Sequence, residues 1–246
     1  MQVKQTEQLI ATPDGQMPAY LFSPIRADSG EQGNQAAILL LMEAFGVTSH
    51  IQEIATRIAQ QGYMVLIPDL YYRDLPNNRF GYDQVEAAMA MMWRLDLNQS
   101  MENDLRSALA ELKAHPAVDP DRIGVTGFCL GGGLTFFTAC RCSDEITAAA
   151  AFYGMILDEW FDAMPNITVP IQLFFGGQDP FIPLDRIQQI QARLQALGKD
   201  YQLQIYPNAG HGFFCDERSD YHPAAAADAW QRWIKFFDRH LNSINT

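Results

Sequence analysis

The sequence predicts an α/β fold in which a doubly wound, mostly parallel β-sheet carries helices on both faces. Short apolar runs alternate along the 246 residues with segments whose apolar side chains recur at helical spacing. The pentapeptide Gly127-Phe128-Cys129-Leu130-Gly131 has the form of a sharp strand-to-helix turn, in which glycine at both ends lets the chain expose a nucleophile. No linker-like or repeated segment divides the chain, so we expect a single domain over residues 1–246.

The first part of the chain predicts an antiparallel hairpin followed by a βαβ crossover. The hairpin turns at Pro13-Asp14-Gly15, and a polar, glycine-containing loop is expected over residues 26–35. A continuous apolar run then predicts a strand buried on both faces, and Gly62 ends the helix that follows it. The expected elements are strands at residues 4–10, 17–22, 36–42 and 63–67, with a helix between 51 and 62.

An aromatic and asparagine-rich loop over residues 69–81 is long enough to form a functional rim. A helix is predicted at residues 82–97, with Val85, Met89 and Met92 on one face. Core filling is the favoured interpretation of this face, and a pliable substrate wall is the alternative. A second helix is predicted at residues 101–114, with Ser100 as its N-cap.

The second half predicts four strands and three helices. The turn at Cys129 joins the first of these strands to a helix of small residues. The last helix follows Pro223 and carries an aromatic and aliphatic stripe of Trp230, Trp233, Ile234 and Phe237. The expected elements are strands at residues 123–126, 148–153, 171–175 and 202–206, with the other helices at 130–138 and 185–197.

Composition limits the partners that the chain can take. Its net charge of −12 disfavours nucleic acid and anionic membrane surfaces, which require clustered Lys and Arg. We expect a cytoplasmic protein, because no apolar stretch approaches 18 residues and no leader peptide is evident at the start.

The four cysteines do not have the spacing of a zinc site or a disulfide framework, so Cys140 and Cys142 are interpreted as small apolar fillers. No metal or other cofactor is expected.

Three polar residues follow predicted strands in the chain order nucleophile, acid, histidine: Cys129, Asp179 and His211. Ligands of such sheets bind outside the carboxyl ends of the strands. A histidine can take the proton of a thiol that is otherwise mostly protonated at neutral pH, and a carboxylate can orient that histidine. Each residue taken alone also has a structural interpretation, and the strongest of these is Asp179 as a turn cap. Their joint order favours a Cys-His-Asp triad.

Two alternatives follow from the same turn. A hydrolase-like fold could serve as a small-molecule binding protein or a redox sensor, with Cys129 as an oxidisable thiol. The second alternative is a nucleotide-binding loop. The Gly-x-Gly-x-x-Gly pattern of such loops is imitated by Gly127, Cys129 and Gly132. This second alternative fails because cysteine occupies the position where glycine admits a pyrophosphate.

The sequence resembles the dienelactone hydrolase family of α/β-hydrolases over nearly its whole length. The similar segments are Glu43-Ala44-Phe45-Gly46, Gly127-Phe128-Cys129-Leu130-Gly131-Gly132, Phe175-Gly176-Gly177-Gln178-Asp179 and Ala209-Gly210-His211-Gly212-Phe213. The resemblance implies hydrolysis of a small ester or lactone through an acyl-enzyme. It also implies that Glu43 takes part in controlling the ionisation of Cys129. The Ala44 and Leu130 amides could then form an oxyanion hole.

One departure from the family concerns the substrate. Family members that act on dienelactones resemble one another in using two arginines to hold the substrate carboxylate, and our alignment puts Glu86 and Cys215 at those positions. Arg79 and Arg218 lie nearby in the sequence and are candidates to replace them. We assign four residues to substrate binding, namely Arg79, Phe45, Tyr153 and Phe213. The expected partner is a small ester or lactone, and the expected state is a monomer or homodimer.

Overall fold

The computed structural model describes residues 1–25, 35–76 and 78–242. The described residues form two compact units within Met1–Gly124 and Val125–Thr246. Nearly all of the loop expected at residues 26–35 lies outside the described residues. The expectation of a single domain stays a prediction.

The first unit contains the antiparallel hairpin and the first parallel strands. Strand β1 (Gln2–Thr12) pairs antiparallel with β2 (Gly15–Ile25), and β2 pairs antiparallel with β4 (Met64–Pro68). Strand β3 (Gln35–Leu41) pairs parallel with β4, and the Gln35 amide donates to the Ala117 carbonyl just before β5 (Val118–Phe128). The order in this unit is therefore β1-β2-β4-β3-β5.

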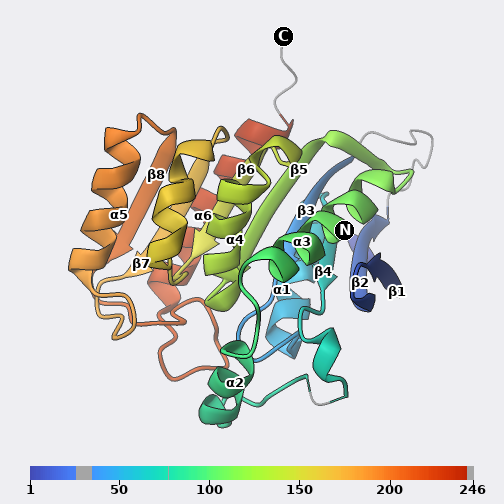
Figure 1. Cartoon of the computed structure of the whole chain (residues 1–246), viewed down its shortest axis with the longest axis horizontal. Coiled ribbons are helices and arrows are strands. Elements are labelled where there is room, and N and C mark those ends of the chain that lie inside the picture. The colour runs from blue at the N-terminus through green and yellow to red at the C-terminus, as the bar shows by residue number, and fades with distance from the viewer. Residues whose placement is uncertain (26–34, 77, 243–246) are drawn as a thin grey trace. The chain divides into compact units, whose positions relative to one another are not determined.

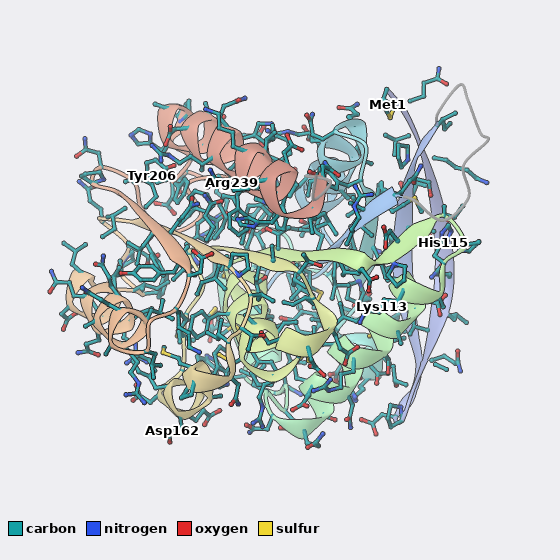
Figure 2. All side chains as sticks on the ribbon, turned by 90° about the horizontal axis from the view of Figure 1, so that it is seen from above. Met1, Lys113, His115, Asp162, Tyr206 and Arg239 are labelled. Carbon is teal, nitrogen blue, oxygen red and sulfur yellow. The ribbon has the colours of Figure 1, made fainter. Side chains whose placement is uncertain are left out.

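Helices cover both faces of the sheet in the first unit. Figures 1 and 2 show α1 (Ser49–Gln60) on one face and α3 (Gln99–Ala114) on the other. Thr48 is the N-cap of α1, and its hydroxyl accepts the Ile51 amide at 3.4 Å, which satisfies one of the free amides of the first turn. A short 3₁₀ helix, η1 (Tyr72–Asp74), and helix α2 (Val85–Met92) lie between them in the chain.

Two predictions about these helices are wrong. Helix α2 has half the predicted length because the chain tightens into i−3 hydrogen bonds from Arg94 and Leu95. Its buried residues are Ala88, Met91 and Met92, whereas Val85 is exposed; apolar residues occur all around this helix, so the sequence marks no single face. Ser100 does not cap α3, since it lies within the first turn and its hydroxyl donates to Asp14 at 2.9 Å.

The second unit continues from the end of β5 with three parallel strands in the order β5-β6-β7-β8. Figures 1 and 2 show two of its helices on one face of the sheet and α6 on the other. The elements are β6 (Ala148–Phe152), β7 (Ile171–Gly176), β8 (Tyr201–Tyr206), α4 (Leu130–Arg141), α5 (Leu184–Ala196) and α6 (Pro223–Phe237). Shorter helical turns are η2 (Ser143–Glu145), η3 (Asp158–Asn166) and the π-helical η4 (Asp238–Asn242).

The predicted aromatic stripe holds α6 against the sheet of the second unit. Trp233 and Phe237 are buried, and the Trp230 ring stacks on Trp233 at 5.1 Å. The Trp233 indole N–H donates to the Thr126 hydroxyl at 3.1 Å, and that hydroxyl donates to the Ala150 carbonyl at 2.7 Å. Each polar atom in this chain of bonds is satisfied, which is the condition for burying it.

The fold class is confirmed as α/β, with a mixed sheet of eight strands and helices on both faces. The N-terminal hairpin is also confirmed. Strand β5 begins five residues before the predicted start, because Asp119, Pro120 and Asp121 give its exposed first half no apolar signal. Within the described ranges, no helix combines the length and the apolar composition needed to cross a membrane.

Candidate active site

Cys129 lies in a sharp turn between β5 and α4. Its backbone has a φ of 56° and a ψ of −116°, an uncommon conformation for a residue with a side chain. The Cys129 amide donates to the Phe152 carbonyl at 3.1 Å, and the Cys129 carbonyl accepts the Gly133 amide at 3.1 Å. A Cβ atom on Gly127 would overlap the Gly131 backbone, and one on Gly132 would overlap the Phe152 carbonyl. The turn therefore requires these glycines and leaves the Cys129 thiol half-buried.

Asp179 and His211 follow the carboxyl ends of β7 and β8. The Asp179 carboxylate is divided between two tasks. Its Oδ1 accepts the Phe181 and Ile182 amides at 2.8 and 3.2 Å, and its Oδ2 lies 2.8 Å from Nδ1 of His211. The turn-capping interpretation of Asp179 and the triad interpretation thus hold together. Both side chains are nearly inaccessible to solvent, which fixes the orientation of the imidazole.

The side chains of Cys129 and His211 also lie close enough to interact. The structure thus brings together Cys129, Asp179 and His211, all within the second unit. Burial opposes protonation of His211. The negative charge of Cys129 and the bond to Asp179 outweigh burial and raise the pKa of His211 to about 10. This arrangement favours transfer of the thiol proton to the imidazole.

Aromatic rings surround His211. Tyr153 and Phe181 approach its ring edge-on, with centroids 5.2 and 5.1 Å away, and Phe213 packs against Tyr153 at 5.2 Å. Tyr153 and Phe213 are fully buried, so they support the histidine from within the fold. Phe181 is 57% exposed and was missed by sequence reasoning, although its position two residues after Asp179 was an available signal.

Glu43 belongs to the first unit and is completely buried. The Tyr82 hydroxyl donates to its Oε2 at 2.9 Å. Its Oε1 is buried with no hydrogen-bond partner in the described part of the chain. Burial of a carboxylate oxygen without a partner is costly, so this oxygen requires an explanation. Tyr82 was also missed, since nothing in the sequence connects it with Glu43.

The two residues that follow Glu43 are held in place by tyrosine side chains. Ala44 is buried, and its carbonyl accepts the Tyr71 hydroxyl at 2.8 Å. Phe45 is buried edge-on to Tyr82, with ring centroids 4.8 Å apart.

In the second unit, Leu130 is the first residue of α4, where backbone amides have no acceptor within the helix. Among residues 1–25, 35–76 and 78–242, no three His, Cys, Asp or Glu side chains form a group that could hold a metal ion.

Comparison with known proteins decides the family. A model of the dienelactone hydrolase family matches residues 17–241. The chain belongs to the dienelactone hydrolase family. A protein of Synechocystis named "Putative carboxymethylenebutenolidase" is 33% identical over 251 residues, which cover 97% of this chain and 98% of that protein. Membership of the dienelactone hydrolase family makes the chain a carboxylic ester hydrolase.

Solved structures agree with the family and with the fold. The crystal structure titled "Putative Dienelactone Hydrolase" from Klebsiella pneumoniae has a TM-score of 0.87 and 28% identity, covering 97% of this chain and 100% of that chain. An esterase of Pyrococcus furiosus is similar in fold alone, with a TM-score of 0.71, 17% identity and coverage of 97% and 93%. The chain therefore has the α/β-hydrolase fold that the sequence predicts.

The positions at which arginine was sought have other residues in this chain. Cys215 is fully buried and Glu86 is exposed at the start of α2, so neither position offers a cation. Arg79 bonds to the Tyr20 hydroxyl and lies over that ring, 5.2 Å from its centroid. The Arg218 guanidinium lies against Gly212, beside His211, and forms an ion pair with Asp220 at 3.8 Å. Both candidate arginines are thus engaged with other side chains.

Proposed function

We propose that the chain hydrolyses small esters or lactones through an acyl-enzyme on Cys129. The observation that carries the proposal is the continuous contact from Cys129 to His211 and from His211 to Asp179. A half-buried thiol in a strained turn, next to a buried imidazole, is the arrangement that activates a cysteine nucleophile. The bond at Nδ1 of His211 leaves Nε2 for the exchange of protons with sulfur and substrate.

The reaction would proceed in two halves. His211 takes the proton of Cys129, and the thiolate attacks the carbonyl carbon of the ester. The tetrahedral intermediate collapses with loss of the alkoxide, which receives the proton from His211 and leaves a thioester on Cys129. Water then attacks the thioester as His211 takes one of its protons, and the carboxylic acid departs while sulfur regains a proton.

Two further roles belong to the proposal. The Leu130 amide at the start of α4 is suited to bind a developing oxyanion, and family resemblance gives Ala44 the second amide. Resemblance also assigns Glu43 to the control of Cys129 ionisation, and its partnerless buried oxygen supports a functional role. If so, Glu43→Gln would shift the pH dependence of kcat/KM, whereas a merely structural glutamate would leave the profile in place.

The proposed substrates are small esters and lactones, with Arg79, Phe45, Tyr153 and Phe213 assigned to substrate binding. The absence of arginine at positions 86 and 215 supports uncharged substrates over those that carry a carboxylate. A panel of dienelactone, neutral lactones, simple esters and thioesters would test this assignment. Preference for dienelactone by a factor of ten or more would contradict the preference for uncharged substrates.

The decisive test uses variants of the triad on the best substrate of this panel. Cys129→Ala and Asp179→Asn should each lower kcat by about a thousandfold or more. Cys140→Ala is the matched control, because that thiol is buried in α4 and should contribute nothing to turnover. Full activity in Cys129→Ala would exclude the proposed mechanism.

We also propose that the enzyme acts in the cytoplasm as a monomer or homodimer, without nucleic acid, membrane or cofactor. The net charge of −12 supports the exclusion of nucleic acid. Light scattering of the purified protein would give the oligomeric state directly.

A further inference from the structure

A groove of about 390 Å³ lies in the second unit, between α6 and the amino-terminal ends of β7 and β8. It is lined by Gln172, Gln202, Asp228, Gln231, Arg232, Lys235, Phe236 and Arg239, which we call the α6 groove. Arg239, labelled in Figure 2, belongs to η4, which directly follows α6. Asp179 and His211 follow the opposite, carboxyl ends of these strands, so the α6 groove is separate from the triad.

Gln172 lies at the bottom of the α6 groove and is only 3% exposed. Its Nε2 donates to Gln202 at 2.9 Å, but its Oε1 is buried with no hydrogen-bond partner among the described residues. A buried amide oxygen normally has a partner. The Gln172 side chain lines the groove, so a turn of its amide toward the opening would let a bound molecule supply the missing donor.

The rim of the α6 groove is cationic, although the whole chain has a net charge of −12. Asp228, Arg232, Lys235 and Arg239 have the spacing of one helical face. The single carboxylate, Asp228, is engaged by Arg232 at 2.6 Å and by the Tyr206 hydroxyl at 2.8 Å. Lys235 and Arg239 form no ion pair within the part of the chain that the structure describes. Two cations therefore remain for a ligand.

We propose that the α6 groove binds a small hydroxy dicarboxylate. Its two carboxylates would pair with Lys235 and Arg239, and its hydroxyl would donate to Oε1 of Gln172. A hydroxyl both donates and accepts, so it would also satisfy this side chain if the amide turned over. The groove has the volume of sites that hold small molecules. This proposal concerns binding away from the triad and does not rest on the proposed function.

Malate and succinate form a matched pair of probes, because they differ only by one hydroxyl group. Titration calorimetry at constant ionic strength should give malate a Kd about tenfold lower than that of succinate. Lys235→Gln combined with Arg239→Gln should weaken malate binding by about tenfold or more. Gln172→Met should reduce malate affinity to that of succinate.

Arg193→Gln is the control, since Arg193 is an exposed cation in the last turn of α5 and does not line the α6 groove. It should leave the Kd of malate unchanged. The proposal is overturned if neither probe binds, if malate and succinate bind equally, or if Arg193→Gln weakens binding as much as the double variant. The double variant changes only exposed side chains, so it decides the matter even if Gln172→Met fails to fold.

Discussion

Cys129 differs from the other three cysteines in backbone, exposure and neighbours. It has a positive φ, a half-buried thiol and an interaction with His211, whereas Cys140, Cys142 and Cys215 are buried. Burial raises the pKa of Cys140 to about 12, so that thiol stays protonated at neutral pH. A positive φ at a residue with a side chain costs about 1–3 kcal/mol, which the glycine-rich turn must offset.

These differences predict a single fast-reacting thiol in the native protein. A bulky disulfide reagent should modify one cysteine rapidly at neutral pH, because thiolate character and access control the reaction. Cys129→Ser should remove that fast phase, and unfolding should release the remaining thiols. A fast phase that persists in Cys129→Ser would show that another cysteine is the reactive one.

At the scale of elements, an ion-pair cluster joins the N-terminal hairpin to α3 and η1 in the first unit. Arg73 lies 2.6 Å from Asp14 in the hairpin turn and 2.7 Å from Asp104 on α3. The Asp104 side chain is fully buried, and the Tyr72 hydroxyl donates to it at 3.0 Å. The bonds from Arg73 and Ser100 lower the pKa of Asp14, although that carboxylate is exposed.

Arg73→Met should destabilise the protein by about 2 kcal/mol, because it leaves Asp104 buried without a cation. Arg94→Met is the control: Arg94 pairs with Asp74 at the surface, and its loss should cost less than about 1 kcal/mol. Denaturant unfolding of both variants would measure the difference. Equal effects would mean that the buried cluster contributes no more than a surface pair.

At the scale of the whole molecule, the raised pKa of His211 connects stability to pH. The folded protein holds this proton up to about pH 10, whereas an ordinary histidine loses it near 6.5. The stabilisation is therefore fully present below pH 6.5 and is lost as the pH rises through 10. His211→Asn should show a smaller fall in the free energy of unfolding over this range than the unmodified chain.

His240→Asn provides the comparison for the pH experiment. Burial lowers the pKa of His240, so its contribution to stability has the opposite sign and grows as the pH rises. This variant should keep the full fall in stability between pH 6.5 and 10. Identical pH profiles for His211→Asn and the unmodified protein would contradict the raised pKa of His211.

The sequence predicted those parts of the fold that repeat a pattern. Strands β3, β4, β6 and β7 are short and mainly apolar, and each was found within one residue of its predicted bounds at either end. The bounds of helix α2 and the start of β5 were predicted wrongly because neither carries a periodic apolar signal there. Apolar periodicity reflects which side chains are buried. It therefore gives no signal for segments that are exposed or that are apolar on every side.

Contacts within the candidate site were predictable only where glycine-rich turns marked the residues. Cys129, Asp179 and His211 each stand in such a turn after a strand, and the structure brings them together. The bond from Tyr82 to Glu43 and the ring contact of Phe181 with His211 depend on side-chain packing, which spacing along the chain does not encode. The cationic α6 groove was not predictable from spacing either. It combines Gln172 on β7 with side chains of α6, a helix that begins 51 residues later in the chain.

The central claim is that Cys129 carries the acyl group during ester hydrolysis. Rapid quenching of the enzyme with p-nitrophenyl acetate, followed by mass spectrometry of its peptides, tests this most directly. One acetyl group should be found on the peptide that contains Cys129, and none should appear in Cys129→Ala. Turnover with acetyl on another residue, or undiminished turnover in Cys129→Ala, would contradict the account.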